Sequence, residues 1–209
     1  MDGVIVHSNP VHARAWRIYN RRFGIETGAA MLERMYGRHN EDIVRDYFGP
    51  GVSAEEAAAH GAAKERLYRE IMGPLLADSL VAGIREFLAR NAGIPMAVAS
   101  NAEPANIAFV LDRGGLRRYF RAVVHGGMVS RPKPSPDVFL RAAAELGAAP
   151  ASCIVFEDSL AGVEGARAAG MRTVGLRTTH RALPGVDLEI DDFLSRDLQL
   201  WLESQHSPC

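Results

Sequence analysis

The chain alternates short apolar runs with stretches of helical pattern after about residue 80, and this alternation constrains the fold most strongly. The apolar runs at 94–99, 122–125, 153–156 and 173–176 lack the two-residue alternation of a half-exposed strand. Helical patterns cover 81–91, 103–113, 136–146 and 160–169. In one of them Pro136, behind Ser135, marks the first helical position and Gly147 marks the end. Strands alternating with helices predict an α/β fold with a Rossmann-like, doubly wound parallel sheet.

The first part of the chain has a different pattern, in which helices are expected and no strand is evident. Apolar residues between about Asn9 and Leu76 recur at spacings of three and four. Ser53 and Glu56 form a capping box at the start of a long helix that should end near Gly73. We therefore expect an all-helical module at 9–79, inserted into an α/β domain formed by 1–8 and 80–209.

Composition and charge argue against several classes of protein. The chain has 209 residues with a formal net charge of -1, so it carries no overall basic field for binding nucleic acid. Its two cysteines form neither a disulfide framework nor a metal-ligand spacing, which is typical of a reducing compartment. The apolar runs fall short of the ~18 residues that a membrane span needs. We expect a cytoplasmic protein that binds neither nucleic acid nor membrane and is a monomer or weak dimer.

Polar side chains follow the predicted strands at the points where ligands bind in such sheets, outside the carboxyl ends of the strands. Each of them alone has an ordinary explanation, as a helix cap, a first-turn charge or a surface lysine. Together they form a set suited to phosphoryl transfer. The set consists of Asp2, Ser100, Asn101, Lys133, Glu157 and Asp158.

Phosphoryl transfer needs each of these chemical groups. A hydroxyl and the amides at a helix start can hold phosphate oxygens, as Ser100 and Asn101 could. A lysine such as Lys133 can neutralise charge on both a phosphate and an attacking carboxylate. Carboxylate oxygens are ligands that Mg²⁺ prefers, and this ion usually keeps several waters. We therefore expect a Mg²⁺ cofactor and a small phosphorylated metabolite as the substrate.

The motifs resemble those of the haloacid dehalogenase superfamily, in the subgroup with a helical cap after the first strand. That subgroup includes phosphoglycolate phosphatase-like and β-phosphoglucomutase-like enzymes. The matching motifs occur in order along nearly the whole chain. They are Asp2-Gly3-Val4-Ile5-Val6-His7-Ser8, Ser100-Asn101, Lys133-Pro134-Ser135-Pro136-Asp137, and Phe156-Glu157-Asp158-Ser159 with Gly162, Ala168, Gly170 and Met171.

The resemblance implies a role for each matching residue. Asp2 matches the second aspartate of the family's Asp-x-Asp-Gly motif, which protonates the leaving group, activates water and contacts Mg²⁺ through its carbonyl. Ser100 matches the phosphate-binding hydroxyl and Lys133 the charge-balancing lysine. Asp158 matches the metal ligand, and Glu157 is a second acidic group near the metal or the lysine.

The first aspartate of that motif, the nucleophile, would stand immediately before Met1. We interpret Met1 as an internal methionine at the x position of the motif, so that the true start lies upstream. The alternative is a real loss that leaves a pseudoenzyme. The residues before this motif form a central strand in the family, so we also expect the 209-residue chain to fold poorly without them.

In the cap, His12 and Lys64 match residues of β-phosphoglucomutase-like enzymes, where the histidine assists a sugar hydroxyl. A helix histidine and a solvated lysine are equally good interpretations. Alignment on Gly37 and on Glu41-Asp42 places Asn40 where the mutase has an arginine for the distal phosphate. Arg38, two residues earlier, could substitute for it.

We therefore expect a Mg²⁺-dependent phosphatase acting on a sugar phosphate or a glycolate-like compound through an aspartyl-phosphate. A phosphomutase of the β-phosphoglucomutase type is the second hypothesis. A non-catalytic protein that binds phosphorylated ligands through Ser100 and Lys133 is the third.

Overall fold

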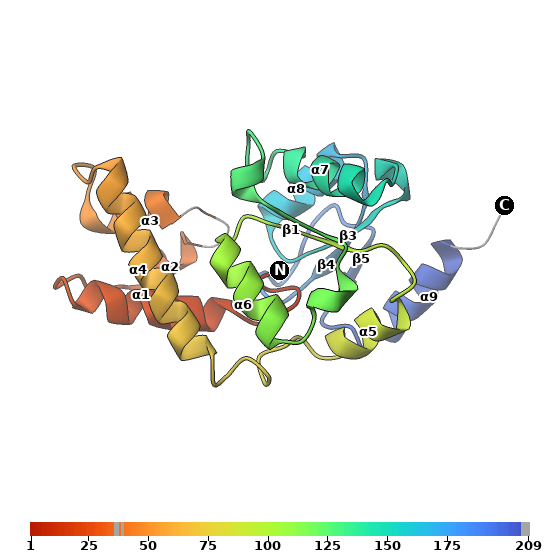
Figure 1. Cartoon of the computed structure of the whole chain (residues 1–209), viewed down its shortest axis with the longest axis horizontal. Coiled ribbons are helices and arrows are strands. Elements are labelled where there is room, and N and C mark those ends of the chain that lie inside the picture. The colour runs from red at the N-terminus through yellow and green to blue at the C-terminus, as the bar shows by residue number, and fades with distance from the viewer. Residues whose placement is uncertain (36–37, 39, 206–209) are drawn as a thin grey trace.

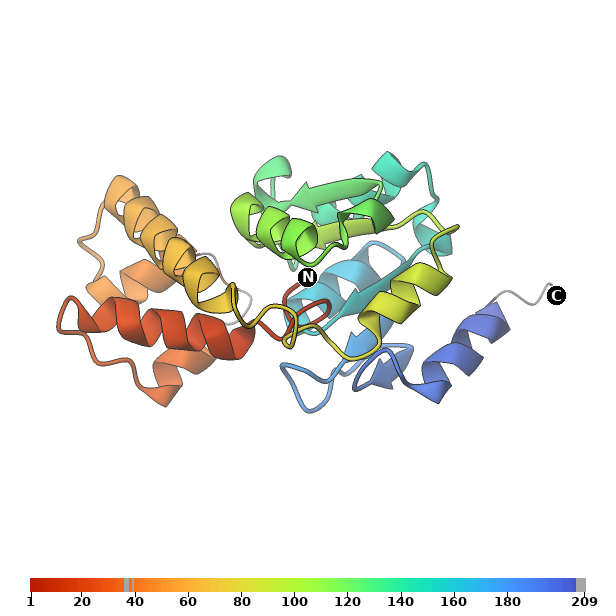
Figure 2. The same ribbon diagram turned by 60° about the horizontal axis from the view of Figure 1, so that its bottom comes forward.

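The chain folds into a helical lobe and a larger lobe that contains the strands (Figures 1 and 2). The structure, a computed structural model, describes residues 1–35, 38 and 40–205. Gly37, used above to align the cap loop, lies outside these residues. Within the described ranges, none of the helices combines the length and the apolar character that crossing a bilayer requires.

The helical lobe consists of α1 (Asn9–Arg21), α2 (Ala29–Glu33), α3 (Asn40–Phe48) and α4 (Ala54–Met72). Its own hydrophobic core includes Trp16, Tyr19 and Val44, because these apolar positions lie on the inner faces of their helices. The predicted capping box is present, with Ser53 and Glu56 each accepting the other's backbone amide. These helices lie within the segment 9–79 predicted as a helical module, and the division of the chain into two domains stays a prediction.

The strands are all parallel to their neighbours, as predicted. β1 (Ala97–Ser100) pairs with β2 (Ala122–His125), and β3 (Ile154–Glu157), β4 (Arg172–Leu176) and β5 (Leu188–Ile190) form a second sheet. The run at 94–99 becomes strand only from Ala97, because the amide of Ile94 closes a turn on Asn91. The sequence prediction missed β5, which is too short to give a periodic signal.

Helices cover both faces of the strands, which confirms the doubly wound α/β class. Figure 1 shows α7 (Asp137–Leu146) and α8 (Leu160–Ala168) on one side. On the other side lie α5 (Ile84–Arg90), α6 (Pro104–Arg113) and α9 (Arg196–Gln205). The predicted start of α7 was wrong by one position. Pro136 is the N-cap, and the Ser135 hydroxyl bonds the Asp137 carboxylate at 2.6 Å instead of capping an amide.

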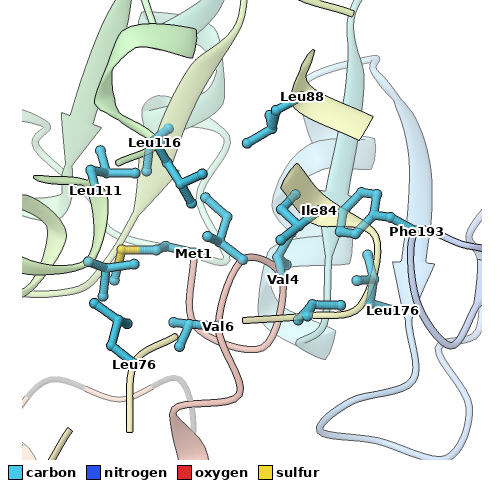
Figure 3. Packing of buried hydrophobic residues seen from close by; sticks show 14 of the residues in the cluster. Met1, Val4, Val6, Leu76, Ile84, Leu88, Leu111, Leu116, Leu176 and Phe193 are labelled. Atoms are coloured by element: carbon cyan, nitrogen blue, oxygen red, sulfur yellow. The ribbon is translucent and has the colours of Figure 1, made fainter. Parts of the chain in front are cut away.

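The N-terminal segment, residues 1–6, lies between the two sheets (Figure 2). It forms turns, with the amide of Ile5 bonded to the carbonyl of Met1 at 2.7 Å. Within the described residues, β1 and β3 share no strand pairing. Apolar side chains instead join the two sheets into one core (Figure 3). That core includes Met1, Val4, Val6, Ile84, Leu111, Leu116, Leu176 and Phe193.

Candidate active site

A cavity of about 420 Å³ opens between the helical lobe and the carboxyl ends of the strands. Its volume is in the range of small-ligand sites. All of the residues predicted for catalysis, substrate binding and metal binding line it. They are Asp2, Ser100, Asn101, Lys133, Glu157 and Asp158 on the strand side, and His12, Arg38 and Lys64 on the cap side. The structure therefore gathers the predicted set in one place, and the role of each residue stays a prediction.

The sheet topology explains how residues so distant in sequence meet. Ser100 is the last residue of β1, and Glu157 is the last residue of β3. Because parallel strands end at the same edge of the fold, both side chains face the cavity. Lys133 reaches the same point from the loop between β2 and α7, and its ammonium donates to the carbonyl of Ala99 at 3.1 Å.

Lys133 and Glu157 form a buried ion pair, with side chains 8% and 5% exposed. The other oxygen of Glu157 accepts hydrogen bonds from the amide of Asp158 at 3.1 Å and from the Ser159 hydroxyl at 3.0 Å. Burial raises the pKa of Glu157, but the charge of Lys133 and that of the Met1 amino group outweigh it and hold the pKa below its ordinary value. Glu157 therefore carries a negative charge that fixes the position of Lys133.

Asp158 is buried beside Glu157. Burial first, and the charge of Glu157 second, raise the pKa of Asp158 to about 7. Its carboxylate accepts a hydrogen bond from Thr179, which also receives one from Asn9 at 2.7 Å. A nearby cation would lower this pKa and stabilise the charged form of Asp158.

Gly3 permits the close approach of the N-terminal segment to Asp158. Its φ is +63°, in the left-handed region that glycine favours, and a Cβ there would lie 2.0 Å from Oδ2 of Asp158. The Thr178 hydroxyl donates to the carbonyl of Gly3 at 2.6 Å and holds the segment in place. The glycine that follows Asp2 in the sequence motif is therefore needed for steric reasons, because a side chain at this position would overlap Asp158.

Asp2 lies at the junction of the strand side and the cap side. Its Oδ1 accepts a hydrogen bond from Ser8 at 2.6 Å and lies 3.7 Å from Nε2 of His12. Burial raises the pKa of Asp2, but the nearby His12, the Met1 amino group and the hydrogen bond from Ser8 outweigh burial and hold this pKa well below its ordinary value.

The carboxylate oxygens of Asp158 are ligands of the kind that Mg²⁺ prefers. Among the described residues, no group of three or more His, Cys, Asp or Glu side chains could enclose a metal ion. Mg²⁺ is commonly bound by one or two carboxylates together with substrate phosphate and water, so a site with few protein ligands suits it. Glu157 was predicted as a second metal ligand, but both of its oxygens already accept hydrogen bonds within the protein. Of the two predicted alternatives, near the metal or near the lysine, these contacts favour a position of Glu157 beside Lys133.

Ser100 and Asn101 provide polar atoms beside Lys133. The Ser100 hydroxyl is buried and accepts the amide of Ala102 at 3.1 Å, which leaves its own proton available. The side-chain oxygen of Asn101 is buried and has no hydrogen-bond partner within the described chain. Buried polar atoms are rarely left unpaired in native proteins, so this atom is a candidate for ligand contact.

On the cap side, His12 stacks on Tyr68 with ring centroids 3.8 Å apart, and its Nδ1 lies 3.3 Å from the ammonium of Lys64. Lys64 is buried, with its ammonium 4.8 Å from the Trp16 ring centroid. Arg38 lines the cavity and is paired with Asp46 at 2.5 Å, and both of these side chains are exposed.

Sequence reasoning missed two residues that contact this site. Thr179 follows β4 closely, so the strand-end rule that found Ser100 and Asp158 could have found it too. Glu65 stands next to Lys64 and bonds to it at 2.5 Å. In sequence Glu65 belongs to a run of alternating charges, which is typical of a solvated helix face, and only the fold reveals its burial.

The fold and site define a doubly wound α/β protein with a helical cap and a cavity lined by charged and polar groups at its strand ends. The profile of the haloacid dehalogenase-like hydrolases matches residues 1–170. The chain is 34% identical over 182 residues to the fructose-1-phosphate phosphatase YqaB of Escherichia coli strain K12, covering 85% of this chain and 93% of that protein.

Two further comparisons agree with this result. β-Phosphoglucomutase of Bacillus subtilis strain 168 is 29% identical over 208 residues, covering 96% of this chain and 90% of that protein. The crystal structure of β-phosphoglucomutase from Clostridium difficile superposes with a TM-score of 0.85 at 25% identity, covering 98% of this chain and 93% of that one. The chain belongs to the haloacid dehalogenase-like hydrolase family and is an enzyme of its phosphatase type.

Proposed function

We propose that the protein is a Mg²⁺-dependent phosphatase that hydrolyses a small phosphorylated metabolite, such as a sugar phosphate or phosphoglycolate, through an aspartyl-phosphate. The observation that carries this proposal is the convergence of Asp2, Ser100, Lys133 and Asp158 on one cavity. Phosphoryl transfer depends mainly on positioning and on stabilising charge, and these residues supply both.

The nucleophile in this proposal is an aspartate immediately before Met1. Met1 lines the same cavity as Asp2, Glu157 and Asp158. A residue joined to the nitrogen of Met1 would therefore stand at the same site. Lys133 would balance the charge of its carboxylate and of the substrate phosphate.

The reaction would proceed in two displacements. The aspartate carboxylate attacks phosphorus, and the P–O bond to the substrate breaks. The negative charge of the bound phosphate would raise the low pKa of Asp2, so that Asp2 takes up a proton when substrate binds and gives it to the leaving alcohol. Asp2 then takes a proton from water, whose oxygen attacks phosphorus, and the P–O bond to the aspartate breaks to release inorganic phosphate. Ser100 and Asn101 hold phosphate oxygens throughout. Asp158, with the main-chain carbonyl of Asp2, would hold Mg²⁺, which when bound neutralises charge on the phosphate.

A phosphomutase reaction is the second candidate, favoured by the approach of His12 to both Asp2, at 3.7 Å, and Lys64, at 3.3 Å. This arrangement would let His12 orient a sugar hydroxyl toward the phosphorylated aspartate. The two reactions differ in product, because a phosphatase releases inorganic phosphate whereas a mutase releases an isomeric sugar phosphate and needs a bisphosphate primer.

The first experiment is to determine the N-terminal peptide of the protein from its native source by mass spectrometry and then to assay that protein. We expect an aspartate immediately before Met1, and phosphate release from sugar phosphates that stops with EDTA and returns with Mg²⁺. Another residue at that position would overturn the aspartyl-phosphate mechanism. Ligand-dependent thermal stabilisation without turnover would instead support the non-catalytic phosphate-binding protein.

A further inference from the structure

A chain of hydrogen bonds that the proposed reaction does not use holds the carboxylate of Asp158. Oδ2 of Asp158 accepts the hydroxyl of Thr179, and Oγ1 of Thr179 accepts the side-chain amide of Asn9 at 2.7 Å. An ionised carboxylate can only accept, so the single proton of the Thr179 hydroxyl goes to Asp158 and its lone pairs face Asn9. In the form of Asp158 that binds a cation, the chain therefore runs in one direction, from Asn9 through Thr179 to the carboxylate.

The two carboxylate oxygens of Asp158 have different surroundings. Oδ2 lies against the backbone of Gly3, where a Cβ would be only 2.0 Å away, and it also accepts the Thr179 hydroxyl. Among the hydrogen bonds between described residues, none ends on Oδ1. Thr179 therefore fixes the rotation of the carboxylate and leaves Oδ1 as the oxygen available to a ligand in the cavity.

The chain of hydrogen bonds starts where the helical lobe starts. Asn9 is the first residue of α1, and Ser8, immediately before it, donates to Oδ1 of Asp2 at 2.6 Å. Two consecutive residues at the start of α1 are thus connected to the two carboxylates that the proposed reaction uses. A displacement of this part of α1 would disturb Asp2 directly and Asp158 through Thr179.

We propose that Thr179 is a positioning residue for Asp158 and that Asn9 extends this support to α1, so that Mg²⁺ binding is coupled to the position of the helical lobe. Hydrogen bonds to a metal-binding carboxylate hold it in the orientation that binds the ion, and their loss typically lowers metal affinity by about 10–100-fold. The bond from Asn9 polarises the Thr179 hydroxyl and keeps it directed at Asp158. This inference rests on the proposed function, because it takes Asp158 as the Mg²⁺ ligand.

The test measures the dissociation constant of Mg²⁺ by isothermal titration calorimetry, at one pH and without substrate, in the protein with its native N-terminus. Thr179→Val keeps the shape of the side chain and removes the hydroxyl, so we expect the Kd to rise by about 10–100-fold. Thr179→Ser keeps the hydroxyl and should stay within about threefold of wild type. Asn9→Ala leaves Thr179 without its donor and should raise the Kd by about three- to tenfold. Arg14→Ala, at an exposed position of α1, is the control and should leave the Kd unchanged.

Phosphate release distinguishes positioning from direct contact with substrate, since Asn9 and Thr179 both line the cavity. For a positioning role, the Mg²⁺ concentration that gives half-maximal activity should rise in Thr179→Val, whereas kcat at saturating Mg²⁺ should stay within about threefold of wild type. An unchanged Kd for Mg²⁺ in folded Thr179→Val, with or without a fall in kcat, would overturn this inference and leave the phosphatase function standing. If Thr179→Val does not fold, Asn9→Ala provides the same test.

The wild-type protein separates a failure of this inference from a failure of the proposed function. Binding of Mg²⁺ without release of phosphate would overturn the phosphatase function, while the calorimetric comparison of Thr179→Val with Thr179→Ser still decides the role of Thr179. A wild-type protein that binds no Mg²⁺ would overturn both.

Hydrogen exchange tests the connection to α1. Because the coupling between two sites is reciprocal, a bond from Asn9 that tightens Mg²⁺ binding must itself be strengthened when Mg²⁺ binds. The amides of Val11 and His12 donate to the carbonyl of Ser8 at 3.0 and 2.9 Å and report on the start of α1. We expect Mg²⁺ to slow their exchange by about threefold or more in wild type and by less in Asn9→Ala. Equal slowing in both proteins would overturn the part of the inference that concerns α1.

Discussion

A Cβ atom on Gly162 would lie 2.1 Å from Cδ of Glu157 and 2.2 Å from its Oε2. The Glu157 carboxylate occupies the first turn of α8, where it accepts the Ser159 hydroxyl, and any larger residue at 162 would displace it. Since Glu157 fixes the position of Lys133, that position depends on the absence of a side chain at Gly162.

The first prediction is that Gly162→Ala loses both stability and activity. Alanine normally favours a helix over glycine, but here its methyl group overlaps a buried carboxylate, so we expect a loss of about 1–3 kcal/mol in unfolding free energy. Urea denaturation and phosphate release measure the two effects. Gly93→Ala, where the added Cβ would meet no atom within 4 Å, is the control. A stabilised and fully active Gly162→Ala would contradict this account.

The second prediction concerns Lys133→Met. Removing one partner of the buried pair leaves Glu157 with an unbalanced charge, which should cost about 3–5 kcal/mol of stability. The double variant Lys133→Met/Glu157→Gln should recover most of that stability without recovering activity, because the charge that faces the phosphate is still missing. Equilibrium unfolding of the two variants checks this. Equal stability of the single and double variants would show that the pair is not coupled.

The third prediction is that Asp2→Asn stops the reaction of an aryl phosphate at the aspartyl-phosphate. A poor leaving alcohol needs the proton of Asp2, so hydrolysis of a sugar phosphate should fall by about 10²–10⁴-fold. p-Nitrophenolate leaves without a proton, so this substrate should still phosphorylate the enzyme and then stall. Stopped-flow absorbance should show a burst of about one equivalent of p-nitrophenolate per enzyme. Asp112→Asn, at an exposed position of α6, should behave as wild type. Steady turnover of the aryl ester without a burst would remove Asp2 from the second step.

The fourth prediction follows from the pKa of Asp158, which burial and Glu157 raise to about 7. A carboxyl group whose pKa is higher in the folded than in the unfolded state binds extra protons on folding, so its contribution to stability falls as pH rises between the two values. Without Mg²⁺, the melting temperature should fall from about pH 5 to 8, and Mg²⁺ should restore it at pH 8. The lowered pKa values of Asp2 and Glu157 affect stability only in more acidic solution.

The Asp158→Asn variant isolates this effect from other groups that titrate in the same range. It should flatten the fall of melting temperature between about pH 5 and 8 and should abolish the stabilisation by Mg²⁺. Differential scanning calorimetry at several pH values provides the measurement. A variant that keeps the pH dependence and the response to Mg²⁺ would place both outside Asp158.

The strand side of the site was predictable because strand ends in a doubly wound sheet converge by topology. Ser100, Lys133 and Asp158 could therefore be placed together without coordinates, and the structure does bring them together. Glu65 could not be found, because its burial depends on how α4 packs against α3 and α6, which local charge patterns do not encode. The sequence prediction missed β5 for a related reason, since a strand of three residues gives no measurable hydrophobic period. Whether the 209-residue chain folds poorly stays a prediction for calorimetry to test.

Bound ligand should make the protein stiffer, because β1 and β3 are not paired with each other within the described residues. Within the described residues of the 209-residue chain, apolar side chains rather than strand pairing join the two sheets there, so the sheets of this chain resist separation less than a continuous sheet would. Lys133 belongs to one part and Glu157 to the other, so their ion pair crosses the division. A phosphate held by Ser100 on one side and by Asp158 through Mg²⁺ on the other would form a second link between the two parts, in addition to the ion pair. In the 209-residue chain, amide hydrogens along β1 and β3 would then exchange more slowly with solvent when phosphate and Mg²⁺ are bound.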